Sequence, residues 1–204
     1  MACKRVRTAV LISGRGTNLK SLIDACAVPD FPAEIALVIS NVEGAGGLQF
    51  ARDANIATKI IPHRPFPSRE AFDAEIDGAL HAANVTLVCE AGFMRIHSEW
   101  FVKRWEGRIL NIHPSLLPKF PGVHVHEQVL AARETESGAT VHFLITELDA
   151  GPIIAQRAVP VMASDTAQTL AARVLDIEHM LYPEALRMVA EGNVTLQNGK
   201  AVFA

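Results

Sequence analysis

Two polar side chains stand two residues apart at the end of an apolar run, in the segment Asn-Ile-His-Pro-Ser-Leu-Leu-Pro. This spacing puts Asn111 and His113 on the same face of a β-strand, where both can reach one substrate atom. An asparagine amide can donate a hydrogen bond to a developing oxyanion, and a histidine can stabilise the same charge and move a proton. The alternative is a buried histidine with a structural role only.

A carboxylate in the segment Leu-Asp-Ala-Gly-Pro is the third candidate. If Asp149 folds back onto His113, the ion pair is expected to raise the pKa of the imidazole, each pKa unit being worth ~1.36 kcal/mol. The alternative is an aspartate that caps its own turn. No serine or cysteine is evidently paired with the histidine, so the set suits direct acyl transfer through a tetrahedral intermediate.

A glycine-rich turn, Ser-Gly-Arg-Gly-Thr-Asn-Leu at residues 13–19, follows the first apolar run. Glycines there let backbone N–H groups approach an anion at the start of a helix, which predicts a phosphate site. A dinucleotide site is disfavoured, because Leu19 replaces the third glycine and Ser40-Asn41 replaces the acidic residue after the second strand. The turn also lacks the Lys-Ser/Thr ending of a P-loop. The alternative is a tight turn in which Thr17 caps the helix.

Strand-length apolar runs alternate with helix-period segments, which predicts an α/β fold with a single doubly wound, mostly parallel sheet and a C-terminal β/helix extension. The expected strands are residues 8–13, 34–40, 58–62, 86–91, 108–113, 140–145 and 153–161. The expected helices are residues 18–27, 47–55, 68–83, 98–104, 124–132 and 166–189, the last broken near Pro183. Asn198-Gly199 predicts a C-terminal hairpin with a type I′ turn. Ligands of such sheets bind beyond the carboxyl ends of the strands.

Length and charge restrict the class of protein. With 204 residues and ~150 residues per domain, we expect one domain, residues 1–204. The net charge of -3 provides no basic field for nucleic acid or an anionic membrane, and no apolar run approaches the ~18 residues of a membrane span. Cys3, Cys26 and Cys89 form no Cys-x-x-Cys pair and have no histidine at metal-ligand spacing, which predicts a reduced, cytoplasmic protein without a metal.

Five ordered segments are more specific together than any one alone. They are residues 13–18, 92–96 (Gly-Phe-Met-Arg-Ile), 111–118, 140–143 (Thr-Val-His-Phe) and 148–154 (Leu-Asp-Ala-Gly-Pro-Ile-Ile). They resemble the motifs of the phosphoribosylglycinamide formyltransferase family, and the similarity covers about residues 7–190. The resemblance implies a Rossmann-like formyltransferase fold, with a phosphate-binding half at about 1–110 and a catalytic, folate-binding half at about 111–204.

The resemblance also implies an activity: transfer of the formyl group of 10-formyltetrahydrofolate to the amine of phosphoribosylglycinamide, in purine synthesis and without a metal. Asn111, His113 and Asp149 match the family's catalytic trio, with His113 as proton donor. The family's phosphate loop matches Gly16, Thr17 and Asn18. Its carboxylate at the glycinamide end matches Glu178. Besides Asn111 and Asp149, the residues that match the folate side are Arg69, Met94, Arg95, Ile96, His97, Ile145, Thr146, Glu147 and Leu148. We expect these small molecules as partners, no nucleic acid or membrane, and a monomer or homodimer.

Two positions depart from the family pattern. Thr17 stands where serine is commoner and keeps the hydroxyl. His97 replaces the more usual leucine, so the resemblance does not determine the wall of the pterin pocket at this position. Three other functions fit the sequence less well. Methionyl-tRNA formyltransferase needs a further basic domain, and formyltetrahydrofolate hydrolase needs an N-terminal regulatory domain. A nucleotide-binding sensor module would leave Asn111, His113 and Asp149 without a purpose.

Overall fold

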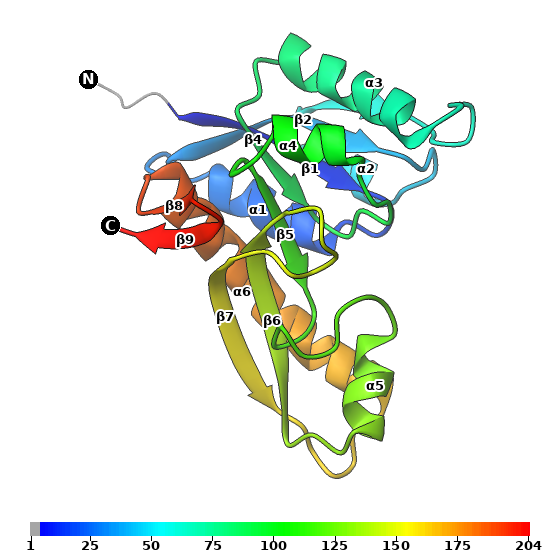
Figure 1. Cartoon of the computed structure of the whole chain (residues 1–204), viewed down its shortest axis with the longest axis vertical. Coiled ribbons are helices and arrows are strands. Elements are labelled where there is room, and N and C mark those ends of the chain that lie inside the picture. Colours follow the sequence, from blue (N-terminus) through cyan, green and yellow to red (C-terminus); the bar gives the residue numbers. More distant parts are fainter. Residues whose placement is uncertain (1–4) are drawn as a thin grey trace.

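The computed structural model describes residues 5–204, which form nine strands and six helices (Figure 1). The strands are β1 (Val6–Ile12), β2 (Ala33–Ser40), β3 (Ala57–Ile60), β4 (Leu87–Glu90), β5 (Ile109–His113), β6 (Glu136–Phe143), β7 (Ile153–Pro160), β8 (Val194–Gln197) and β9 (Lys200–Phe203). The helices are α1 (Thr17–Cys26), α2 (Gly47–Asp53), α3 (Arg69–Ala82), α4 (Glu99–Arg104), α5 (Val125–Ala131) and α6 (Ala167–Ala190). None of these helices combines the length and hydropathy that a membrane span requires.

Seven strands form one sheet in the order β3-β2-β1-β4-β5-β6-β7. The five strands from β3 to β5 are parallel, whereas β6 pairs antiparallel with β5 and β7 antiparallel with β6. The predicted mostly parallel sheet is therefore confirmed. In Figure 1 the parallel strands lie in the upper part of the view, and β6 and β7 extend below them. Because the strand order reverses between β1 and β4, a ligand crevice is expected at their carboxyl ends.

The sheet buries apolar side chains on both faces, and one face turns polar where the site lies. Leu110 and Ile112 pack on the face covered by α1 and α6, while Ile109 packs on the face covered by α3 and α4. Side chains alternate along a strand, so Asn111 and His113 follow Ile109 on the α3/α4 face. The apolar pattern of β5 thus ends in two polar side chains at the carboxyl edge of the sheet.

The predicted break at Pro183 is wrong, because α6 runs unbroken over 24 residues with this proline inside it. Proline removes one helical hydrogen bond, but tertiary packing opposes the break. Next to it, Tyr182 is fully buried and its hydroxyl donates to the carbonyls of Glu90 and Leu110. This anchor holds the helix against β4 and β5 at the point where its own hydrogen bonding is weakest.

The strand expected at residues 140–145 is displaced. β6 begins at Glu136 and ends at Phe143, because its pairing with β7 extends from Glu136 opposite Pro160. The residues that begin this strand include Ser137 and Gly138, which have low strand propensity, and the antiparallel partner compensates for it. The C-terminal hairpin is confirmed, with Asn198 and Gly199 at φ 51° and 71°, as a type I′ turn requires.

Candidate active site

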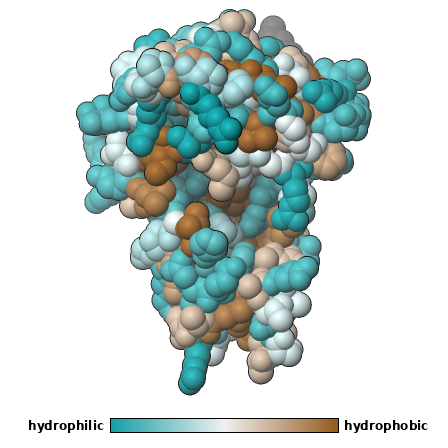
Figure 2. Space-filling view, turned by 90° about the vertical axis from the view of Figure 1, so that its right-hand side faces the viewer, coloured by the Kyte–Doolittle hydropathy of each residue, from teal (hydrophilic) through white to brown (hydrophobic). Residues whose placement is uncertain are grey.

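A cavity of about 670 Å³, here called the strand-end cavity, opens beyond the carboxyl ends of β4 and β5. Figure 2 shows the molecule hollowed between its upper and lower parts, with apolar and polar residues side by side. Most predicted catalytic and folate residues line this cavity: Asn111, His113, Asp149, Met94, Arg95, Ile96, His97, Ile145, Thr146, Glu147 and Leu148. Arg69 is exposed at the start of α3 and is not among the lining residues.

The side chains of His113 and Asp149 lie together at the floor of the strand-end cavity. Nδ1 of His113 is 3.4 Å from Oδ2 of Asp149, and both side chains are buried. Nε2 of His113 donates to the carbonyl oxygen of Phe120 at 2.9 Å. Both ring nitrogens of His113 therefore face oxygen acceptors from other segments of the chain.

Asp149 sits in a turn that is held tightly against β6. Its φ of 51° is left-handed, which is uncommon for a residue with a side chain, and its Oδ2 accepts a hydrogen bond from the Gly122 amide at 2.8 Å. Two residues on, a Cβ at Gly151 would lie 1.8 Å from the carbonyl oxygen of Phe143, so only glycine fits there. The carboxylate reaches other segments of the chain, and the alternative of an aspartate that only caps its own turn is wrong.

His142 holds the Asn111 amide. The two residues are opposite each other in the β5–β6 register, and Asn111 Nδ2 lies 3.2 Å from His142 Nε2. Burial lowers the pKa of His142, which favours the neutral ring, and its Nδ1 donates to the carbonyl of Phe143 at 3.0 Å. Nε2 is then the acceptor, so one amide N–H of Asn111 is engaged and the other is left for a ligand. The Thr-Val-His-Phe segment was the signal for this residue, which was missing from the predicted site.

His97 is not a simple replacement for leucine in the cavity wall. Its Nδ1 lies 2.7 Å from Oδ1 of Asp73 and its Nε2 lies 2.8 Å from Oε1 of Glu90, all three side chains being buried. The ring stacks between Phe93 and Phe101. Burial alone would lower the pKa of His97, but the two carboxylates oppose burial and raise it to about 9. We refer to Asp73, Glu90 and His97 as the buried charge cluster.

The pH dependence of stability should reveal this cluster. The pKa of His97 rises from 6.5 to about 9 on folding. Its contribution to the free energy of unfolding is therefore present in full below pH 6.5 and is lost as pH rises through 9. At 1.36 kcal/mol per pKa unit, it amounts to about 3 kcal/mol. Urea unfolding between pH 6 and 10 should show the free energy of unfolding falling by this order in the native protein and much less in His97→Leu. Equal pH slopes in the two proteins would contradict the assignment.

A second cavity of about 450 Å³, the helix-end cavity, lies between the glycine-rich turn and α6. It is lined by Gly16, Thr17 and Asn18. The two cavities meet, because they share the lining residues Asn18, Gly92, Pro114, His126 and Glu178. Gly16 is the N-cap of α1 at φ 76°, with no side-chain cap, so Thr17 does not cap the helix as the alternative required. A Cβ at Gly16 would lie 2.4 Å from the Cα of Gly47. Because no side chain caps this helix N-terminus, its backbone N–H groups are left to accept an anion from the cavity.

A buried carboxylate lies where the two cavities meet. Glu178 Oε2 accepts a hydrogen bond from Asn18 Nδ2 at 2.5 Å. Burial raises the pKa of Glu178, and the hydrogen bond from Asn18 opposes this shift. Oδ1 of Asn18 is buried without a hydrogen-bond partner in the described residues. The pair therefore leaves a carboxylate and an amide oxygen as acceptors, which suits a ligand that donates hydrogen bonds.

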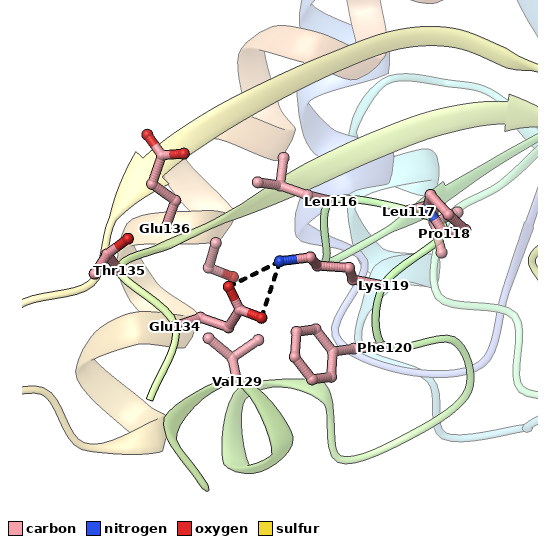
Figure 3. A pocket seen from close by; sticks show the side chains of 10 residues that line it. Leu116, Leu117, Pro118, Lys119, Phe120, Val129, Glu134, Thr135 and Glu136 are labelled. Carbon is pink, nitrogen blue, oxygen red and sulfur yellow. Dashed lines mark hydrogen bonds and ion pairs between the residues drawn. The ribbon is translucent and has the colours of Figure 1, made fainter. Parts of the chain in front are cut away.

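A third cavity, of about 460 Å³, lies outside the turn that follows β5 and contains none of the predicted residues (Figure 3). Lys119 bridges both carboxylate oxygens of Glu134 at 2.9 Å there, beside Phe120 and Val129. Among residues 5–204, no group of three or more His, Cys, Asp or Glu side chains is arranged to hold a metal ion. The two cavities that share Asn18 and Glu178 are thus the ones that carry the predicted polar residues.

Comparison with known proteins gives one consistent family. The Formyl transferase family model matches residues 6–186. The phosphoribosylglycinamide formyltransferase of Escherichia coli K12 is 45% identical over 192 residues, which cover 94% of this chain and 91% of that protein. The trifunctional purine biosynthetic protein adenosine-3 of Gallus gallus is 52% identical over 190 residues, but this chain spans only 19% of it.

Two solved structures show the same fold. Glycinamide ribonucleotide transformylase 1 from Symbiobacterium toebii has a TM-score of 0.94 at 43% identity, covering 98% of this chain and 94% of that chain. A formyltetrahydrofolate deformylase from Pseudomonas syringae has a TM-score of 0.91 at 27% identity, covering 99% of this chain and 67% of that chain. The family match, the identities and the shared fold agree, and the chain belongs to the formyl transferase family.

Proposed function

We propose that this chain transfers the formyl group of 10-formyltetrahydrofolate to the amine of N1-(5-phospho-D-ribosyl)glycinamide, in de novo purine biosynthesis. The products are the N-formyl nucleotide and tetrahydrofolate. The observation that carries this proposal is the junction of the two cavities at Asn18 and Glu178: one contains an anion-accepting helix N-terminus and the other the polar trio Asn111, His113 and Asp149. The identity to the Escherichia coli phosphoribosylglycinamide formyltransferase over nearly its whole length supports the same substrates.

The nucleotide occupies the helix-end cavity in this proposal. Gly16, Thr17 and Asn18 hold its phosphate at the N-terminus of α1, where the helix dipole favours negative charge. Glu178 accepts a hydrogen bond from the glycinamide end, which directs the amine toward the strand-end cavity. The half of the chain before about residue 110 thus supplies the phosphate loop, and the half after it supplies the polar trio and Glu178.

The formyl donor occupies the strand-end cavity. Its flat, amide-like ring lies among the backbone and side chains of Met94, Arg95, Ile96 and His97 and of the segment 145–149, that is Ile145, Thr146, Glu147, Leu148 and Asp149. Arg95 is suited to an anionic part of the folate. Arg69 is assigned to a portion of the folate that extends beyond the cavity, because it lies outside the lining residues.

The chemistry follows from the polar trio. The lone pair of the glycinamide amine attacks the formyl carbon, and the carbonyl electrons move to its oxygen. The free N–H of Asn111 donates a hydrogen bond to this oxyanion, and one such donor is worth about 10²–10³ in rate. The positive charge of the protonated His113 stabilises the oxyanion as well. Asp149 and a water molecule move the proton from the amine to N10 of the folate. Collapse of the oxyanion re-forms the carbonyl and breaks the bond to N10, which releases tetrahydrofolate.

Formyltetrahydrofolate hydrolysis is the second candidate, because the Pseudomonas syringae deformylase has the same fold. The helix-end cavity favours the transferase, since hydrolysis needs no nucleotide site. The experiment mixes the purified protein with 10-formyltetrahydrofolate, with and without the nucleotide, and follows folate absorbance. The transferase requires the nucleotide for turnover, and equal rates without it would support the hydrolase instead. The third alternative, a nucleotide-binding sensor module, predicts no turnover in either mixture.

Glu178→Gln should weaken nucleotide use while leaving the protein at least as stable. Replacing a charged acceptor by a neutral one is expected to raise the KM for the nucleotide about tenfold or more. Burial raises the pKa of Glu178, so the ionised carboxylate opposes folding above that pKa, and its removal should maintain or raise Tm at pH 7. The matched control is Glu184→Gln, an exposed carboxylate on α6 that pairs with Arg157. An unchanged KM in Glu178→Gln would contradict the assigned contact.

We further propose that the enzyme works in the cytoplasm as a monomer or homodimer. Cys26 and Cys89 are buried free thiols, and burial raises the pKa of Cys26 to about 12. Buried thiols with raised pKa values are protonated and inert, which fits a protein without disulfide bonds between these positions. Cys3 lies outside the described residues. Size-exclusion chromatography with light scattering distinguishes the two oligomeric states.

A further inference from the structure

The buried charge cluster of Asp73, Glu90 and His97 has no role in the chemistry described above, yet two of its members line the strand-end cavity. Glu90 and His97 are lining residues, while Asp73 lies behind them on α3. Burying three ionisable side chains is costly unless each is paired, and here His97 lies between the two carboxylates. An apolar wall would avoid this cost, so the position of Glu90 calls for a functional reason.

The sheet register places Glu90 beside the reaction site. Glu90 on β4 is the register partner of Asn111 on β5. Partners on adjacent parallel strands lie on the same face of the sheet, about 4.8 Å apart. The Glu90 side chain therefore lies next to the amide that, in the proposed function, contacts the formyl oxygen. A group joined to the formyl nitrogen would pass directly over this carboxylate.

We propose that Glu90 is a specificity-determining residue whose carboxylate accepts hydrogen bonds from N–H groups on the fused ring of the formyl donor. This inference rests on the proposed function, because it takes the donor to be a folate. The ring of tetrahydrofolate carries amine and amide N–H groups, and a carboxylate is the side chain that pairs with such donors most strongly. Oε1 of Glu90 lies 2.8 Å from Nε2 of His97, so Oε2 is the oxygen that accepts from the folate ring.

His97 and Asp73 act as positioning residues for Glu90. Asp73 accepts from the Ser98 amide with Oδ2 at 2.6 Å, and its Oδ1 faces His97 at 2.7 Å. The stacked Phe93 and Phe101 rings restrict the imidazole plane between them. The Glu90 backbone is fixed as well, since its carbonyl accepts from the buried Tyr182 hydroxyl at 2.9 Å. The carboxylate is thus held by its neighbours before a ligand arrives, which reduces the entropy lost on binding.

The test compares ring recognition in the native protein, in Glu90→Gln and in Glu90→Leu. Isothermal titration calorimetry, without nucleotide, measures Kd for tetrahydrofolate and for 5-methyltetrahydrofolate, in which a methyl group replaces the hydrogen on N5, the ring N–H nearest the formyl nitrogen. The native protein should prefer tetrahydrofolate by tenfold or more, and both variants should lower this preference to about twofold. In the transfer assay, KM for the formyl donor should rise by a similar factor, while KM for the nucleotide stays within twofold.

The matched control is Asp77→Asn. Asp77 is another carboxylate of α3 that is mostly buried and binds Arg104 and Trp105, but it does not line the cavity. It should destabilise the protein without changing the ring preference. His97→Leu should lower the preference, as a positioning role requires.

Several outcomes would overturn the inference. One is an unchanged ring preference in folded Glu90→Gln and Glu90→Leu. Another is loss of the folded state in both variants, judged by near-ultraviolet circular dichroism, which would assign Glu90 a structural role. The proposed function fails separately. If native protein binds tetrahydrofolate but transfers no formyl group, the transferase is rejected and the ring preference still decides the role of Glu90.

Discussion

Replacing His113 by alanine is expected to lower kcat by about 10²–10⁴-fold while the affinity for the nucleotide stays within twofold. The imidazole is the one group of the polar trio that can both stabilise the oxyanion and move a proton. The nucleotide phosphate is assigned to the helix-end cavity, whose lining does not include His113. Steady-state kinetics at saturating donor and calorimetric binding of the nucleotide separate the two effects.

The control for this variant is His81→Ala, which removes a half-exposed histidine on α3 that is hydrogen-bonded to the Asp77 carbonyl. Its kcat should stay within twofold of the native value. A His113→Ala protein that retains native kcat would reject the catalytic assignment, whatever its stability. Loss of nucleotide binding together with kcat would indicate instead that the turn 113–120 has been disrupted.

Asp149→Asn should lower kcat by about 10²–10³-fold with little change in fold. Asparagine tolerates the left-handed φ of 51° at this position, and its side-chain oxygen can still accept from the Gly122 amide. The substitution removes the negative charge that lies 3.4 Å from Nδ1 of His113. The imidazole then loses its charged neighbour, and the amine loses the carboxylate that, in the proposed function, helps to move its proton.

Circular dichroism should show native structure in Asp149→Asn, and its KM for the nucleotide should be unchanged. The exposed carboxylate Asp24, paired with Lys20 on α1, provides a control as Asp24→Asn. A kcat within twofold of native in Asp149→Asn would contradict the assigned role. In that case the contact between Asp149 and His113 would be structural only.

The polar trio could be predicted because local patterns determine it. The spacing of Asn111 and His113 follows from the strand period of two, and β5 is confirmed as the strand that carries them. Asp149 is different, because β6 ends beside the beginning of β5, with Phe143 opposite Leu110. Only the return of the turn after β6 brings the carboxylate to His113, so the Leu-Asp-Ala-Gly-Pro motif predicted it and the strand pairing did not. The parallel sheet was predictable for the same reason, since alternating apolar and amphipathic segments are visible without tertiary information.

Other features depend on contacts that the sequence does not display. Pro183 predicts a break in α6, but the buried Tyr182 beside it holds the helix in place. Glu90 is visible in the sequence as the one charged residue of the apolar strand β4, but its proposed role depends on His97, which the fold places beside it. His142 was visible in a motif, yet its contact with Asn111 depends on the β5–β6 register. Tertiary pairing decided each of these cases.

The central claim is that the formyl group passes directly to the nucleotide amine at the junction of the two cavities. The measurement is carbon NMR of a mixture that contains native protein, phosphoribosylglycinamide and 10-formyltetrahydrofolate labelled with ¹³C in the formyl carbon. The account predicts that the label appears in the N-formyl amide of the nucleotide, in equal amount to the tetrahydrofolate released. Label that appears in free formate, at the same rate with and without the nucleotide, would contradict it.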